Sequence, residues 1–280
     1  MTRWLLNERI KTTDTGIQIQ LFEALKGLFR KPRASYEVAQ LPWAGRTEEE
    51  MVAKLAIISL HHSLLNVLKN ERGIHSETLM VAIGAIAGHA AAYAVWETMI
   101  KPGHLQLGRD IHTVEVKGSS DKFYFGNSIN AFLVPEKPET LPLWNQIAGS
   151  AVATGVPAAE LPDVREMFRH NADAVGTPAF GIVRAPDDHM PGWTAPQAIN
   201  ALWHFVKPIL GRADNPGYAG YSVPVEQWPL VVAIVAGQYV TMAKDVLNPQ
   251  LSVRFIMEAA IATSKMDPNS VLQVGPERSA

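Results

Sequence analysis

The chain of 280 residues contains no cysteine. Without thiols it forms no disulfide bond, carries no thiolate nucleophile and binds no zinc or iron–sulfur cluster through sulfur. Charged residues make up only 19% of the chain, and the formal net charge is −2. The sequence therefore lacks the basic field that attracts nucleic acid, and we expect no nucleic-acid partner.

Signals for export and for nucleotide chemistry are also missing. The first residues, MTRWLLNERIKTTD, lack the apolar segment and small-residue cleavage site of a secretory signal, so we expect a cytoplasmic protein. No GxGxxG follows a predicted strand, and neither a GxxxxGK[ST] loop nor an EF-hand pattern occurs, so we expect no nucleotide cofactor. What is present is a chain with 47% hydrophobic residues, a composition typical of globular proteins.

The longest uncharged run covers residues 78–96 and contains His89. Its 19 residues are nearly enough to cross a bilayer, and Gly84 and Gly88 form a GxxxG pair. Seven of the 19 residues are alanine, however, and the mean hydropathy of the whole chain is only +0.01. A helix that is apolar on all sides is typical of a protein core. We therefore predict a buried core helix and no transmembrane span.

Helix signals recur along the chain. Thr47 and Glu50 form a capping box, which predicts a helix from there to about residue 70, and Ser76 is a good N-cap for the uncharged helix. Their short connection predicts an antiparallel helical hairpin. A basic amphipathic helix is predicted at 17–31. Further helices are predicted within 140–156, 161–176, 196–210, 225–247 and 249–265, two of them opened by Thr194 with Gln197 and by Asn248-Pro249.

Alternating apolar and polar residues predict a β-hairpin around residues 111–134, with its turn at 118–121 and a third strand at 129–134. A short strand is predicted at 180–184. The resulting fold class is mainly α (α+β), with a helical bundle-like core and a small antiparallel hairpin. Prolines at 135, 138 and 142 indicate a linker, so we predict either two subdomains, 1–137 and 138–280, or one continuous domain.

One candidate site lies on the predicted helical hairpin. His89 and Glu97 are eight residues apart, so both lie on one helical face. In an antiparallel hairpin His61 and His62 lie about one turn, roughly 5–6 Å, from the level of His89. These three histidines and the carboxylate are ligands that a divalent metal accepts, and His89 or Glu97 is alternatively a catalytic acid or base. The competing interpretation is an ordinary buried histidine and a surface Glu97–Lys101 ion pair.

Two further groups of residues are candidates. Asp188 and His189 lie together in the loop APDDHMPGW, where a carboxylate beside an imidazole is suited to acid–base chemistry, although such loop aspartates often form turns. Tyr93, Trp96, Asn127 and Asn130 combine aromatic rings with amides, as small-molecule pockets do. Gly126-Asn127 is equally typical of a turn.

No motif identifies a reaction, so whether the protein is an enzyme stays open, and three functional hypotheses follow. The first is a soluble cytoplasmic helical protein that binds a small apolar ligand or a protein partner, with a homo-oligomer compatible with its small-residue helices. The second is a metal-assisted hydrolase that uses the His61, His62, His89 and Glu97 cluster. The third is peripheral membrane association through the basic amphipathic helix at 17–31.

Overall fold

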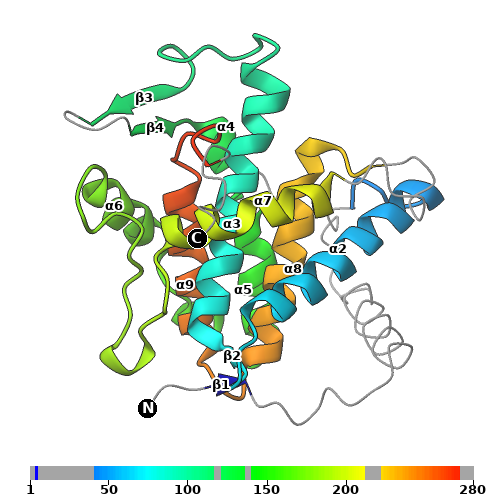
Figure 1. Ribbon diagram of the computed structural model, residues 1–280, viewed down its shortest axis with the longest axis vertical. Helices are drawn as coiled ribbons and strands as arrows, with labels where there is room; N and C mark the ends of the chain where they lie inside the picture. The colour runs from blue at the N-terminus through cyan, green and yellow to red at the C-terminus, as the bar shows by residue number, and fades with distance from the viewer. Residues whose placement is uncertain (1–3, 6–40, 117–120, 136–139, 212–221, 272–280) are drawn as a thin grey trace, which may run out of the picture.

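The computed structural model describes residues 4–5, 41–116, 121–135, 140–211 and 222–271 (Figure 1). The basic amphipathic helix predicted at 17–31 and most of the turn predicted at 118–121 lie outside these residues. The elements, in chain order, are β1 (Trp4–Leu5), α2 (Thr47–Leu68), β2 (Ile74–His75), α3 (Ser76–Val95), a π-helical turn η2 (Trp96–Ile100), β3 (His112–Glu115), β4 (Lys122–Phe125), α4 (Asn127–Asn130), α5 (Leu143–Ala153), η3 (Ala158–Glu160), α6 (Val164–Ala174), η4 (Asp187–His189), α7 (Ala195–Leu210), η6 (Val225–Gln227), α8 (Trp228–Ala243) and α9 (Pro249–Thr263). The fold is mainly helical with small antiparallel sheets, as predicted.

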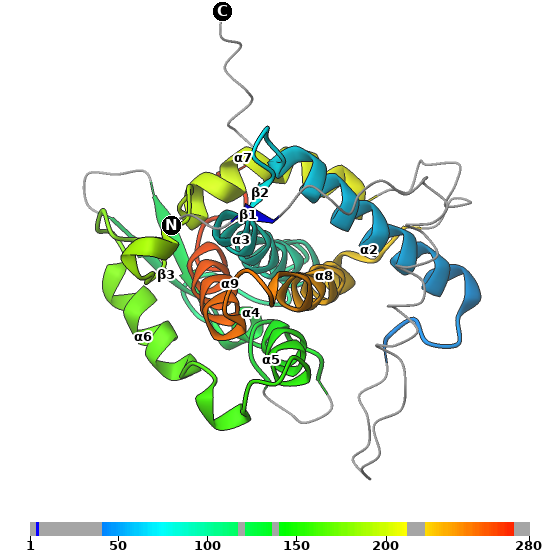
Figure 2. The same ribbon diagram turned by 90° about the horizontal axis from the view of Figure 1, so that it is seen from below.

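Helix α3 is the central element of the fold. It packs against α7, α8 and α9, which surround it when the molecule is viewed from below (Figure 2). Its most apolar 18-residue window is 94% buried, so the predicted core helix is confirmed. By length and composition alone, both α2 and the segment Ser76–Ile100 are apolar enough to cross a membrane, and the expectation of no span stays a prediction.

Small residues on α3 determine how closely α9 approaches. A Cβ atom added at Gly84 would lie 2.3 Å from the carbonyl oxygen of Ile256, and one at Gly88 would lie 1.9 Å from that of Ala260. The Oγ1 of Thr263 donates a hydrogen bond to the Ala85 carbonyl at 2.8 Å. The GxxxG pair therefore forms the contact between two buried helices inside one chain.

The predicted antiparallel packing of α2 along α3 is wrong. Helix α2 packs mainly on α8 and α7, because α3 is already surrounded by the three C-terminal helices. Helix α2 begins after Arg46 without a side-chain cap, so Thr47 is its first residue and not its N-cap. Ser76 is likewise the first residue of α3, and its hydroxyl donates to the carboxylate of Glu77 instead of capping the helix.

The β-hairpin is confirmed, but two predicted strands are not. Strands β3 and β4 pair antiparallel, from His112 opposite Phe125 to Glu115 opposite Lys122. The third strand predicted at 129–134 is instead α4 and a turn, because the other edge of β4 is taken by the chain after α9, where Phe123 pairs with Met266. Residues 180 and 181 belong to a turn, and residues 182–184 form no regular secondary structure.

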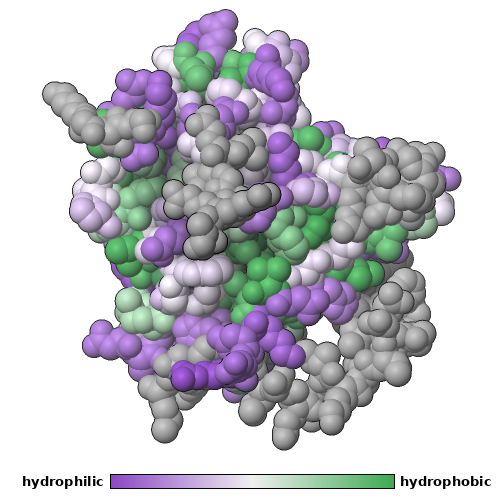
Figure 3. Space-filling model, viewed as in Figure 1, coloured by the Kyte–Doolittle hydropathy of each residue, from purple (hydrophilic) through white to green (hydrophobic). Residues whose placement is uncertain are grey.

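The remaining predicted helices are found as α5 to α9. The capping box of Thr194 and Gln197 opens α7, and Asn248 caps α9 ahead of Pro249. The main hydrophobic core takes residues from both sides of position 137, and the division into two subdomains stays a prediction. Figure 3 shows hydrophobic side chains in the middle of one face, with hydrophilic ones at its upper and lower ends.

Candidate functional site

The structure does not bring the predicted metal ligands together. His61 packs on Tyr239, with ring centroids 5.0 Å apart, and the half-buried His62 meets His61 edge-on. His89 instead packs on Trp203. Among the residues that the structure describes, no three His, Asp or Glu side chains are grouped to hold a metal ion. The predicted centre depended on α2 lying along α3, which it does not.

His89 is a core residue with unusual surroundings. Its ring lies 4.4 Å from that of Trp203, and neither ring nitrogen has a hydrogen-bond partner among the described residues. Burial, together with the charge of Lys207, lowers the pKa of His89 to about 3. His89 is therefore neutral at physiological pH.

The other candidates on this helix belong to packing or to the surface. Tyr93 is buried, stacks on Trp228 with 7° between the ring planes, and lies beneath the ammonium of Lys207. Trp96 stacks on Tyr124 at 6.0 Å. The carboxylate of Glu97 forms an ion pair with Lys101 at 3.1 Å, so Glu97 takes part in the ordinary surface ion pair that was the alternative to a metal or catalytic role.

His189 contacts a carboxylate that the sequence did not single out. Glu77, in the first turn of α3, is fully buried, and its carboxylate accepts from His189 Nδ1 and from the hydroxyl of Ser76, both at 2.8 Å. His75 Nε2 lies 3.3 Å from the same carboxylate, while Asp188 is 3.8 Å from His189 Nε2. Since Gly192 also donates to Thr78, these contacts attach the 187–192 loop to the N-terminus of α3.

The predicted amide Asn130 meets a buried lysine. Asn127 is exposed at the start of α4, whereas Asn130, one turn later, accepts a 2.5 Å hydrogen bond from Lys265 Nζ through its Oδ1. Lys265 is only 4% exposed and follows the end of α9. Its backbone carbonyl accepts from Tyr124 N–H at 2.7 Å, so strand β4 holds the lysine in place.

No carboxylate among the described residues forms an ion pair with Lys265. Within the described residues its ammonium contacts Asn130 and lies 5.7 and 5.6 Å from the ring centroids of Phe125 and Phe168. Burial lowers the pKa of Lys265 to about 8. Fully buried lysines are rare unless paired, because desolvation disfavours the charged form. A buried lysine beside a pocket, with a lowered pKa and with no carboxylate partner among the described residues, is therefore a candidate functional residue.

Asn130 and Phe168 also line a pocket of about 500 Å³ between α4, α5 and α6. Its apolar wall is supplied by Val134, Pro135, Trp144, Val164 and Phe168. Arg165, which is exposed, adds a second cation at its rim. With its Oδ1 held by Lys265, the amide nitrogen of Asn130 has no partner in the described part of the chain and is available to a ligand.

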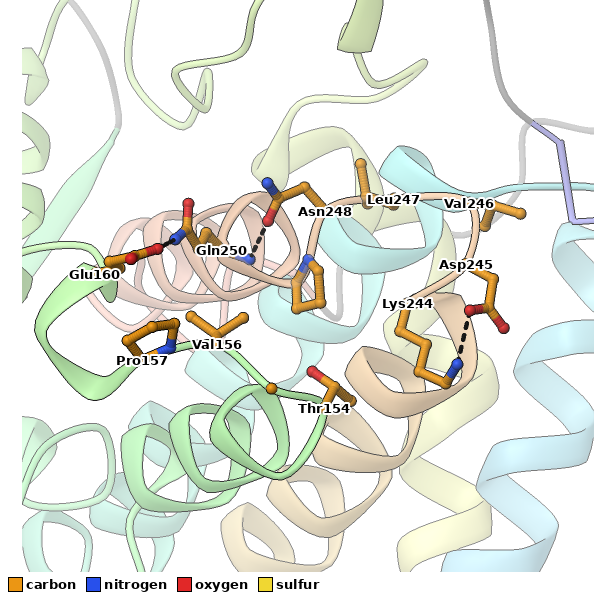
Figure 4. Close-up of a pocket in the computed structure, with 12 residues that line it drawn as sticks. Thr154, Val156, Pro157, Glu160, Lys244, Asp245, Val246, Leu247, Asn248 and Gln250 are labelled. Carbon is orange, nitrogen blue, oxygen red and sulfur yellow. Dashed lines mark hydrogen bonds and ion pairs between the residues drawn. The ribbon is translucent and has the colours of Figure 1, made fainter.

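A second pocket of similar size is a poorer candidate. It lies between the end of α5 and the turn from α8 to α9 (Figure 4). Its polar side chains point toward one another: Lys244 binds Asp245 at 2.6 Å, and Gln250 donates to Glu160 at 2.9 Å. Because these groups already satisfy one another, a ligand gains little by replacing their partners.

Sequence reasoning named Asn130 but missed Lys265 and Glu77. A signal for Lys265 was present in the sequence. Glu258, Ile261 and Lys265 are spaced by three and four residues, so Lys265 continues the helical face on which Ile261 is buried. A charged residue in register with an apolar face is the pattern to look for. Glu77 had no such signal, because a glutamate in the first helical turn is ordinary.

Comparison of the chain with protein-family models, with curated proteins and with solved structures found no match. The functional argument therefore depends on the geometry of the site itself.

Proposed function

We propose that this protein binds a small molecule with an apolar body and an oxygen-bearing head group in the pocket between α4, α5 and α6. The volume of about 500 Å³ is in the usual range for small-molecule sites. Trp144 and Phe168 offer aromatic surface to an apolar body, and Val134 and Val164 complete the wall. This composition, mostly apolar with few polar groups, is typical of such sites.

The observation that carries the proposal is the buried Lys265 amine behind Asn130. Together with the Asn130 amide and the Arg165 guanidinium, it gives this end of the pocket donors and positive charge. Within the described residues no carboxylate forms an ion pair with Lys265. A ligand oxygen, above all a carboxylate or carbonyl oxygen, supplies the missing acceptor.

Calorimetric titration with two probes tests the proposal. Naphthalene-2-carboxylate and naphthalene-2-methanol share one apolar body and differ in the head group. We expect both to bind with one site per chain, the carboxylate more tightly. Phe168→Ala removes a wall residue and is expected to weaken both probes by about tenfold, which corresponds to about 1.4 kcal/mol. Absence of saturable heat for both probes would contradict the proposal.

Two arginines on α6 provide a matched pair of variants. Arg165 lines the pocket, whereas Arg169 is exposed one turn later and is not among the lining residues. We expect Arg165→Ala to weaken the carboxylate probe severalfold and the alcohol probe little, because only the carboxylate attracts the guanidinium. Arg169→Ala should leave both affinities unchanged. Equal effects of the two variants would show that binding occurs elsewhere.

The other expectations remain predictions. A protein partner, a homo-oligomer and a cytoplasmic location are compatible with this proposal. Membrane association through residues 17–31 concerns a segment outside the described residues. The metal-assisted hydrolase is not proposed further, because the described residues do not form its ligand cluster.

A further inference from the structure

Lys265 differs from four lysines that the structure describes on the surface. Four lysines, on four different elements or their ends, form ion pairs with Asp or Glu: Lys54, Lys101, Lys122 and Lys244. Lys265 instead has an amide as its hydrogen-bond acceptor and two phenyl rings as neighbours. A carboxylate partner would hold Lys265 in its charged form. The amide and the rings that contact Lys265 among the described residues stabilise that charge less.

The position of the amine relates it to the pocket. Asn130 and Phe168 each contact Lys265 on one side and line the pocket on the other. The backbone of Lys265 is fixed by Tyr124 and by the adjacent pairing of Met266 with Phe123. Lys265 itself does not line the pocket, so the imine requires a ligand head group that displaces the Asn130 amide and then meets an amine at a fixed position.

We propose that Lys265 forms a reversible imine with an aldehyde or ketone that occupies this pocket. This inference rests on the proposed binding function and names its ligand class. The Nζ lone pair adds to the carbonyl carbon, and one N–H proton passes to the carbonyl oxygen, which gives a carbinolamine. The nitrogen lone pair then expels the hydroxyl group, which takes up a proton and leaves as water, while the remaining N–H proton is lost. No oxidant or reductant is consumed.

The surroundings favour each part of this step. Asn130 Oδ1 accepts one N–H, so the lone pair of a neutral amine points away from Asn130. Phe125 and Phe168 exclude water from the product, which slows hydrolysis of the imine. Because burial lowers the pKa of Lys265 to about 8, a larger fraction of its side chains is neutral at pH 7 than for an ordinary lysine.

Reductive trapping on the full chain tests the inference. The protein is incubated at pH 7.5 with a small excess of naphthalene-2-carboxaldehyde and sodium cyanoborohydride, and adducts are located by intact-mass and peptide mass spectrometry. We expect one adduct per chain, on Lys265, with the paired lysines unlabelled. The initial rate should rise with pH to a half-maximum near 8. Naphthalene-2-methanol, which cannot form an imine, should slow the labelling by competition.

Binding of naphthalene-2-methanol to the native protein separates this inference from the binding proposal. We expect Lys265→Met to lose the fast labelling by at least tenfold, and its far-ultraviolet circular dichroism reports whether the variant is folded. The competition by naphthalene-2-methanol needs only the native protein, so the test does not depend on the variant. Slow labelling spread over the surface lysines, with naphthalene-2-methanol still bound, would overturn the imine and leave the binding function intact. Failure of naphthalene-2-methanol to bind the native protein would overturn the binding function, whatever the labelling pattern.

Discussion

At the scale of single residues, Gly88 brings the backbone of α3 against that of α9. The absent side chain leaves room for the Ala260 carbonyl, and Thr263 completes the contact through its hydroxyl. Such close approach adds dispersion contacts along both helices, which a larger residue would remove. The GxxxG pair was readable from the sequence, but its partner was not, because small residues fit any helix of suitable shape.

Substituting this glycine should be costly. In Gly88→Ala the new Cβ would lie 1.9 Å from a backbone oxygen, so α9 must move. We expect the free energy of unfolding to fall by at least about 2 kcal/mol, measured by chemical denaturation.

Gly149→Ala is the matched control. Gly149 is exposed on α5, where an added Cβ meets nothing within 4 Å. There we expect stabilisation by about 0.5–1 kcal/mol, since alanine has the higher helix propensity. A Gly88→Ala variant as stable as Gly149→Ala would contradict the described packing of α3 on α9.

At the scale of elements, one carboxylate attaches the segment between α6 and α7 to α9. Glu258 is buried, and it accepts from the backbone N–H and the Nε of Arg184, both at 2.7 Å. The guanidinium also contacts Glu166 on α6. The Arg184 amide, at the end of the strand predicted at 180–184, is therefore bonded to a side chain and not to a neighbouring strand. A hydrogen-bond partner 74 residues away in the sequence was not predictable from the local sequence pattern.

Removing one member of this pair should destabilise the protein. In Arg184→Met the buried Glu258 carboxylate loses its counter-charge, and we expect the free energy of unfolding to fall by about 3 kcal/mol. The double variant Arg184→Met with Glu258→Met should recover much of this loss, because no unpaired charge remains. Both values are measurable by urea denaturation.

Glu166→Gln is the control for this pair. Glu166 is exposed, and its ion pair with Arg184 is expected to contribute less than about 1 kcal/mol. Additive losses in the Arg184 and Glu258 double variant would show that the two residues do not depend on each other.

At the scale of the whole molecule, two buried histidines contribute to the loss of stability in acid. Burial, with the charge of His62, lowers the pKa of His61 to about 4, and burial lowers that of His89 to about 3. Both side chains are neutral in the folded protein, while in the unfolded chain they take up protons near pH 6.5. The unfolded state therefore binds more protons below pH 6.5, and stability falls as the pH falls.

We expect this loss to reach about 3 kcal/mol per histidine by pH 4, which together is a large part of a typical unfolding free energy. Denaturation curves between pH 7 and pH 4 measure it. His89→Leu should reduce the pH dependence of the unfolding free energy by about 1.4 kcal/mol per pH unit in this range. His204→Gln, at an exposed position on α7, is the control. An unchanged slope in His89→Leu would contradict a buried, neutral His89.

The sequence by itself determined the local structure: the mainly helical class, the uncharged core helix, the caps at Thr194 and Asn248, and the β3–β4 hairpin. These depend on residue periodicity and on bonds within a few positions, which a single chain reveals. Only the tertiary structure decided which helices surround α3, that His61 and His89 do not converge, and that Lys265 lies against Asn130. Those outcomes depend on which side chains from distant segments pack on the same surface. The spacing of residues along the chain does not predict which of these long-range contacts form.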